Sequence, residues 1–112
     1  MKSKKLNEEK CAPCKAGTPR LTPDEAQKYF SELAAGWVMQ SAHIYKRFTF
    51  KDFSTAMVFI NKMAKIAEAE AHHPNFGLGD YRYVDVYIWT HAIAGLSRND
   101  FILAAKIDAI SV

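Results

Sequence analysis

The longest periodic pattern in this chain, between Asp52 and Pro74, constrains the fold more than any other feature of the sequence. Asp52 is a preferred N-cap residue, and apolar residues follow it at the i, i+3, i+4, i+7 spacing of one helix face. They are Phe53, Ala56, Met57, Ile60, Met63, Ala64, Ala67 and Ala71. Because the residue before a proline avoids the α region, the helix should end at His72 and His73. The pattern predicts a helix of about five turns, with an apolar face that must pack against another layer.

Shorter helices and strands account for the rest of the chain. Thr22 and Glu25 form a capping box that begins a helix, and Gly36 is a suitable residue to end it. Ser97 and Asp100 form a second capping box, which begins a C-terminal helix. Runs of β-forming residues predict strands at 37–39, 44–50, 75–78 and 81–92.

The order of these elements, α-β-β-α-β-β-α, predicts an α+β fold. Its sheet should be four-stranded and mostly antiparallel, with the helices packed on one face. In the last strand Val84, Val86 and Ile88 alternate with polar and aromatic residues, so these three should face the helices. The chain has 112 residues, near the commonest size of one domain. We assign residues 21–112 to that domain and residues 1–20 to a flexible basic tail.

The positive charge of the chain comes from that tail. Residues 1–20 contain six Lys and Arg against two Glu, a net charge of +4, and the remainder has a net charge of −1. A nearly neutral domain does not predict a nucleic-acid partner. Cys11 and Cys14 have the spacing of half a zinc site or a redox pair, but no second pair completes four ligands. Two free thiols in a tail are the simpler interpretation, and we expect no metal site.

Nothing in the sequence predicts a membrane protein. The longest wholly apolar stretch near the middle of the chain is the five residues 56–60, whereas a membrane helix needs about 20. The basic first residues are not followed by an apolar core, so they do not predict a secretory signal. We therefore expect a cytoplasmic protein.

Three histidines are candidates for acid–base chemistry: His72, His73 and His91. Glu68 lies one helical turn before His72, so the carboxylate and the imidazole can face each other. A carboxylate neighbour and the negative end of a helix both stabilise a protonated imidazole. His73 must leave helical geometry before Pro74, so it should approach a bound molecule from a different direction.

Each of these residues also has a structural explanation. Histidine is common at helix C-termini, where it complements the helix dipole. Glu68 and His72 could form a surface pair, and His91 could be a half-buried strand residue. Capping alone explains Asp100. A zinc site of three histidines is conceivable, although vicinal His72 and His73 do not have the i, i+4 spacing of known helical zinc motifs.

A wider pattern, covering roughly residues 20–110, distinguishes between these alternatives. It comprises Glu68-Ala69-Glu70-Ala71-His72-His73-Pro74, Tyr81, His91 and Asp100, with the blocks Gly36-Trp37, Phe48-Thr49-Phe50, Thr90-His91 and Gly95-Leu96-Ser97. This pattern resembles the signature of pterin-4a-carbinolamine dehydratases, and the tail with its two cysteines resembles that of bacterial members. Phe76 stands where many members carry Trp.

The resemblance implies a fold, a reaction and a set of site residues. It implies an α+β domain that assembles into a homodimer or homotetramer. The implied reaction removes water from 4a-hydroxytetrahydrobiopterin to give a quinonoid dihydropterin, without a metal or a cofactor. The implied acid–base residues are His72, His73 and His91. Glu68, Phe76 and Trp37 are expected to bind the pterin, although Phe76 and Trp37 could equally belong to the core. Asp100 matches the pattern, and we expect its role to be structural.

Two alternative functions share the same fold. One is a non-catalytic pterin-binding or protein-docking module, because mammalian relatives also act as transcription-factor cofactors. The other keeps the pterin pocket for a molybdopterin-related ligand, handled through the two cysteines of the tail. Retention of all three histidines favours the enzyme. The sequence does not separate the pterin substrate from a molybdopterin-related one.

Overall fold

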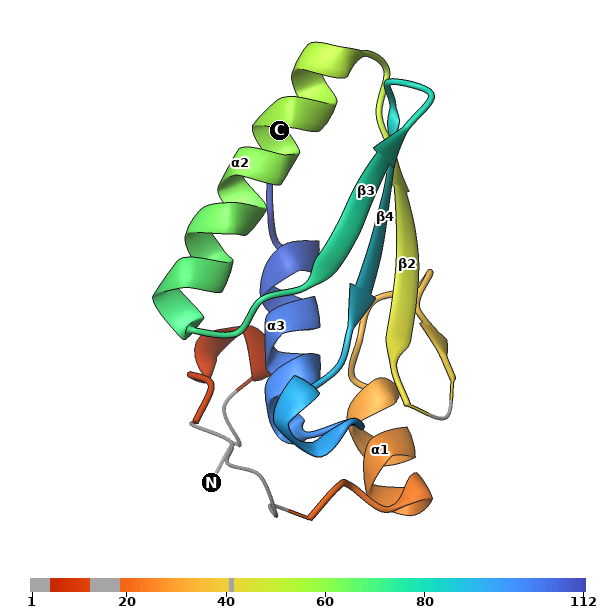
Figure 1. Ribbon diagram of the computed structural model, residues 1–112, viewed down its shortest axis with the longest axis vertical. Coiled ribbons are helices and arrows are strands. Elements are labelled where there is room, and N and C mark those ends of the chain that lie inside the picture. Colours follow the sequence, from red (N-terminus) through yellow and green to blue (C-terminus); the bar gives the residue numbers. More distant parts are fainter. Residues whose placement is uncertain (1–4, 13–18, 41) are drawn as a thin grey trace.

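The computed structural model describes residues 5–12, 19–40 and 42–112 and has the predicted α+β architecture (Figure 1). The sheet has four strands in the order β1-β2-β4-β3, and all three pairings are antiparallel. Helices α2 and α3 lie on one side of it, and α1 packs against α3. The elements are η1 (Leu6–Glu8), α1 (Pro23–Phe30), β1 (Val38–Met39), β2 (Ile44–Thr49), α2 (Phe53–Glu70), β3 (Asn75–Gly79), β4 (Tyr83–Ile88), η2 (His91–Ile93) and α3 (Arg98–Asp108).

Helix α2 begins as the sequence predicts and ends slightly earlier. The Asp52 carboxylate accepts a hydrogen bond from the backbone N–H of Thr55 at 2.8 Å. At the other end Ala71 adopts the left-handed conformation, with φ 52°. The N–H of His72 then donates back to the carbonyl of Ala67 at 3.1 Å, which closes the helix as a Schellman motif does. The left-handed residue turns the chain sharply, so His72 and His73 leave the helix axis together.

The core lies between the sheet and the helices. Val84, Val86 and Ile88 of β4 are fully buried, which confirms the face predicted for them, and Ile44 of β2 is buried beside them. Phe101 from α3 packs in the same cluster and is also fully buried. The rigid layer formed by these side chains sets the positions of the loops at the ends of β4, α2 and α3.

The predicted strand at 81–92 is too long at both ends. Asp80 and Tyr81 both have positive φ, so they form the turn between β3 and β4. Strand β4 ends at Ile88, and the chain then folds into a loop that contains η2. A β-bridge between Thr90 and Gly95 closes this loop. His91 therefore lies in the loop and not in a strand.

The described part of the predicted tail packs against the domain. Leu6, in η1, is only 5% exposed and belongs to the core cluster, and η1 contacts α3. In Figure 1 η1 lies beside the ends of α2 and α3. Residues 5–12 are thus part of the packed fold, whereas Cys14 lies outside the described residues. Within the described part of the chain, no helix combines the length and the apolar character needed to cross a membrane.

Replacing Leu6 with Ala should test whether this segment stabilises the fold. Removal of a buried leucine side chain leaves a cavity, so we expect the free energy of unfolding to fall by about 2 kcal/mol or more. The matched control is Val58→Ala on the exposed side of α2, where we expect a change within about 0.5 kcal/mol. Urea unfolding followed by circular dichroism measures both. Equal, small effects would mean that residues 5–12 contribute nothing to stability.

Candidate active site

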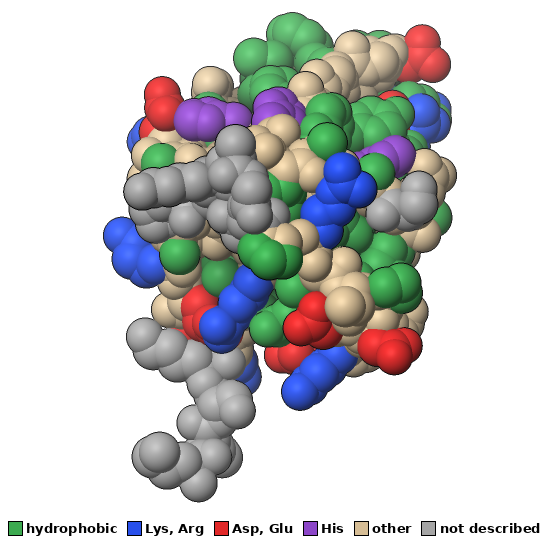
Figure 2. All heavy atoms as spheres, turned by 60° about the horizontal axis from the view of Figure 1, so that its bottom comes forward, with side chains coloured by type: hydrophobic (Ala, Val, Ile, Leu, Met, Phe, Trp, Pro, Cys, Tyr) green, Lys and Arg blue, Asp and Glu red, His purple; other side chains and the backbone are tan. Residues whose placement is uncertain are grey.

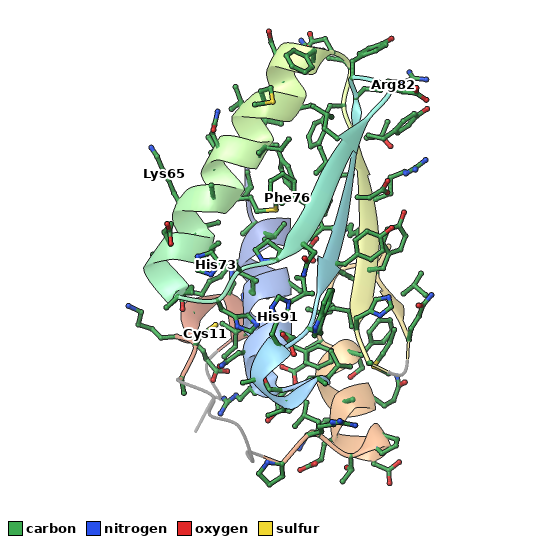
Figure 3. The ribbon with its side chains drawn as sticks, viewed as in Figure 1. Cys11, Lys65, His73, Phe76, Arg82 and His91 are labelled. Carbon is green, nitrogen blue, oxygen red and sulfur yellow. The ribbon has the colours of Figure 1, made fainter. Side chains whose placement is uncertain are left out.

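A cavity of about 440 Å³ lies where the C-terminal end of α2, the loop after β4, the start of α3 and the N-terminal segment meet. The cavity brings together His72, His73 and His91, which come from two distant parts of the sequence. Figure 3 places His73, His91 and Cys11 at this end of the fold, whereas Arg82 lies at the opposite end. In Figure 2 histidine side chains lie close together at the surface. The other lining residues are Cys11, Ala12, Glu70, Ala71, Trp89, Thr90, Ala92 and Asn99.

The partner of His72 is Asp100 and not the predicted Glu68. The Nε2 atom of His72 lies 2.7 Å from Oδ1 of Asp100, and these two side chains are 12% and 0% exposed. Since a carboxylate can only accept, Nε2 donates the proton of this bond. Nδ1 of His72 then has no hydrogen-bond partner among the described residues. The prediction placed His72 on the helix face of Glu68, but the left-handed Ala71 turns it toward α3.

Asp100 itself is held by the capping box that the sequence predicts. Its Oδ2 atom accepts hydrogen bonds from the backbone N–H of Ser97 at 2.8 Å and from the hydroxyl of Thr90 at 2.9 Å. The hydroxyl oxygens of Thr90 and Ser97 are 2.6 Å apart and share a hydrogen bond. The structural role expected for Asp100 is therefore confirmed, and the same carboxylate also orients His72.

His73 forms the pair that was predicted for its neighbour. Its Nε2 atom lies 2.9 Å from Oε2 of Glu68, and the two side chains are 61% and 77% exposed. A pair so open to water contributes little to stability. Glu68 itself does not line the cavity, whereas His73 does.

His91 is oriented by two residues that sequence reasoning missed. The side-chain nitrogen of Asn75 lies 3.2 Å from Nε2 of His91, and the Trp89 ring packs against the imidazole with the centroids 4.7 Å apart. An amide nitrogen only donates, so Nε2 accepts and the ring proton of a neutral His91 lies on Nδ1. Asn75 follows the His-His-Pro motif directly, but its contact with His91 depends on the pairing of β3 with β4.

Trp37 and Phe76 do not line the cavity. Trp37 is 6% exposed, and its indole N–H donates to Oδ2 of Asp108 at 2.7 Å, so it belongs to the core, the alternative role considered for it. Phe76 lies opposite Val86 on the helix-facing side of β3 and is 47% exposed. Their predicted role in binding rested on aromatic character, which core and edge positions also favour.

Two ionisable groups of the cavity wall have shifted pKa values. Burial raises the pKa of the Cys11 thiol to about 12, and the negative charge of Glu70 contributes in the same direction. Burial alone would also raise the pKa of Glu70, but hydrogen bonds from the Cys11 backbone N–H and from Lys106 outweigh it, and the pKa is lowered. Near neutral pH the wall therefore presents a neutral thiol beside a paired carboxylate. Among the described residues no group of three or more His, Cys, Asp or Glu could hold a metal ion.

Comparison with known proteins identifies the family. The family model described as pterin 4 alpha carbinolamine dehydratase matches residues 19–110. This chain belongs to that family. A protein of Rickettsia canadensis that carries the name pterin-4-alpha-carbinolamine dehydratase is 48% identical over 93% of this chain and 95% of its own length. A protein of Vibrio cholerae with the same name is 44% identical over 95% and 99%.

Two solved structures of the pterin dehydratase type share the fold. A transcriptional coactivator/pterin dehydratase from Brucella melitensis has a TM-score of 0.74 and 38% identity, covering 81% of this chain and 97% of its own. A pterin dehydratase-like protein identified as a RuBisCO assembly factor of the alpha-carboxysome has a TM-score of 0.57 and 26% identity, covering 66% and 87%. The carbinolamine dehydratases are lyases.

Asp100 and Glu25 occupy the same position in two capping boxes, which makes them a matched pair. Asp100 is fully buried, whereas Glu25 is exposed. We expect Glu25→Ala to lower the free energy of unfolding by about 1 kcal/mol, the usual cost of a lost cap. Asp100→Ala should cost about 2 kcal/mol more, because it leaves the buried Thr90, Ser97 and His72 groups without their acceptor. Chemical denaturation measures both, and equal losses would contradict the special role of Asp100.

The thiol of Cys11 should react slowly with alkylating reagents. In a Cys14→Ser variant Cys11 is the only cysteine. Since the reactive species is the thiolate, a thiol with a pKa of about 12 should react with iodoacetamide near neutral pH at least about 100-fold more slowly than N-acetylcysteine. Its rate should also keep rising with pH where that of N-acetylcysteine levels off. A rate that levels off at the same pH as that of N-acetylcysteine would contradict the raised pKa.

Proposed function

We propose that this protein dehydrates 4a-hydroxytetrahydrobiopterin to the quinonoid dihydropterin, with His72, His73 and His91 as the acid–base and binding set. The observation that carries the proposal is that all three histidines line one cavity, where a fully buried carboxylate orients His72. Membership of the carbinolamine dehydratase family supports the same substrate class.

The reaction needs two proton transfers and no change of oxidation state in the protein. The 4a-hydroxyl leaves as water after it receives a proton, and a ring N–H gives up its proton as the new double bond forms. One side chain must act as the acid and another as the base, and both must reach the same bound ring. Histidine is suited to both roles because its neutral form accepts a proton and its imidazolium form donates one near neutral pH.

The hydrogen bonds of His72 and His91 support a division of these two roles between them. With Nε2–H held by Asp100, His72 has Nδ1 as its accepting nitrogen, and the carboxylate stabilises the imidazolium that forms. His91 carries a proton on Nδ1, and it can act as the acid in its imidazolium form, which becomes neutral when that proton is transferred to the leaving hydroxyl. We therefore assign the base to His72 and the acid to His91. His73, tethered to Glu68, completes the cavity wall and contacts the polar edge of the pterin.

A protein-docking module is the alternative function, and the descriptions of the two structural relatives support it. One is described as a transcriptional coactivator as well as a dehydratase, and the other as an assembly factor. A docking surface alone does not require three histidines around one cavity with a buried carboxylate behind one of them. The dehydration assay separates the two functions.

Assembly into a homodimer or homotetramer is part of the same proposal. The sheet has two edge strands, β1 and β3, and Phe76 on β3 is 47% exposed. An uncovered sheet edge with an exposed aromatic residue favours association. Light scattering of the purified protein measures the molar mass of the assembly, and a monomer would contradict the proposed homodimer or homotetramer. The cytoplasmic location predicted from the sequence stays a prediction.

Alanine substitutions at the histidines test the proposed catalysis. We expect His72→Ala and His91→Ala each to lower kcat by about 10²-fold or more, the usual contribution of an acid–base group. His43→Ala is the matched control because His43 lies beside Tyr87 and Trp89 and does not line the cavity. Its rate should stay within about twofold of the wild type.

The substrate for this assay is 4a-hydroxytetrahydrobiopterin generated enzymatically, and its loss of water is followed by absorbance. Wild-type protein that does not exceed the spontaneous rate would overturn the proposed enzyme and favour the docking module. Rates within a few fold of the wild type in the His72 and His91 variants would overturn their catalytic assignment alone.

A further inference from the structure

The end of the N-terminal segment Glu9–Ala12 lines the histidine cavity and is held there by side chains of the domain. Cys11 and Ala12 are lining residues of the cavity, although they lie about 60 positions or more before the histidines in the sequence. At one end Leu6 is buried in the core, and Glu9 forms an ion pair with Arg98. In Figure 3 Cys11 lies at the same end of the fold as His73 and His91.

Asn99 fastens the end of this segment. Its side-chain oxygen accepts from the backbone N–H of Ala12 at 2.9 Å, and its side-chain nitrogen donates to the carbonyl of the same residue. This two-fold pairing fixes both the position and the orientation of the Ala12 peptide groups. Asn99 is 6% exposed and directly precedes Asp100, the carboxylate that orients His72. The cavity wall and the catalytic histidine are thus held by consecutive residues of α3.

Glu70 fastens Cys11 in a similar way. The backbone N–H of Cys11 donates to Oε1 of Glu70 at 2.9 Å, and Lys106 pairs with Oε2 of the same carboxylate at 3.2 Å. The Cys11 thiol donates to the carbonyl of Asn99 at 3.6 Å. Glu70 is the last residue of α2, two positions before His72. Of the two anchors of the segment, Glu70 therefore lies two positions before His72, and Asn99 directly precedes the carboxylate that orients it.

We infer that Cys11 and Ala12 form one wall of the pterin cavity and that Cys11 sets its width. The inference rests on the proposed function for the identity of the ligand, a pterin. A wall made of backbone, a neutral thiol and a methyl group offers no charge to the ligand. It therefore contributes shape and excludes water, and its loss should weaken binding without removing an acid or a base.

Larger side chains at Cys11 should narrow the cavity. We expect the affinity for 7,8-dihydrobiopterin to fall in the order wild type, Cys11→Val, Cys11→Phe, with at least about a tenfold loss for the phenylalanine variant. In the dehydration assay the same variant should raise KM by a similar factor while kcat changes by less than about threefold, because the wall contacts ground state and transition state alike. Fluorescence titration measures the binding and does not depend on turnover.

Lys10→Phe is the matched control for added bulk. Lys10 precedes Cys11 in the same segment and is exposed, but it does not line the cavity, so its affinity should stay within about twofold. Ala12→Phe places the same bulk at the second lining position of the segment and should weaken binding as Cys11→Phe does. Circular dichroism checks that each variant is folded.

The outcomes separate this inference from the proposed function. One outcome is that the wild type dehydrates the pterin while folded Cys11→Phe and Ala12→Phe bind it as tightly as the wild type. The segment would then not form a wall of the pterin cavity, and the proposed dehydratase activity would be supported. If the wild type binds the pterin without dehydrating it, and the two variants bind it weakly, the cavity wall is supported and the proposed dehydratase activity is contradicted. A wild type that binds no pterin overturns both.

Discussion

The hydrogen bond between Asp100 and His72 is the interaction on which the rest of the site depends. A carboxylate with no exposure to solvent is costly unless its oxygens are satisfied. Here Ser97, Thr90 and His72 satisfy them, and the three belong to the start of α3, the loop after β4 and the end of α2. Satisfying one buried charge thus joins three elements at a single point, and that point is the back of the histidine cavity.

Two backbone features make this bond geometrically possible. The left-handed Ala71 ends α2 one residue before His72 and turns the imidazole toward α3. The bridge between Thr90 and Gly95 folds the chain after β4, which places His91 in a loop at the same end of the sheet. An uninterrupted helix or a longer strand would carry the histidines along two separate elements. Local chain reversals therefore assemble the site, and the rigid core behind them keeps it in place.

Much of the fold could be predicted because its signals are local. The caps at Asp52, Thr22 and Ser97 and the buried face of β4 depend on residues close in sequence, and all are present in the structure. The partners of the histidines could not be predicted in the same way. Glu68 lies one helical turn before His72, yet it pairs with His73, while Asp100 reaches His72 from 28 positions away. The burial of Leu6 likewise depends on packing against α3, which is about 90 positions away in the sequence.

The sequence by itself determined the order of the elements, their caps and the set of three histidines, because periodicity, capping and motif spacing are properties of short stretches of chain. Tertiary structure alone decided which carboxylate orients which imidazole, that Trp37 lies in the core, and that Cys11 and Ala12 line one side of the cavity. These depend on strand register and helix packing, which bring distant residues within hydrogen-bond distance. No local pattern encodes such contacts, since they arise from the shape of the whole core.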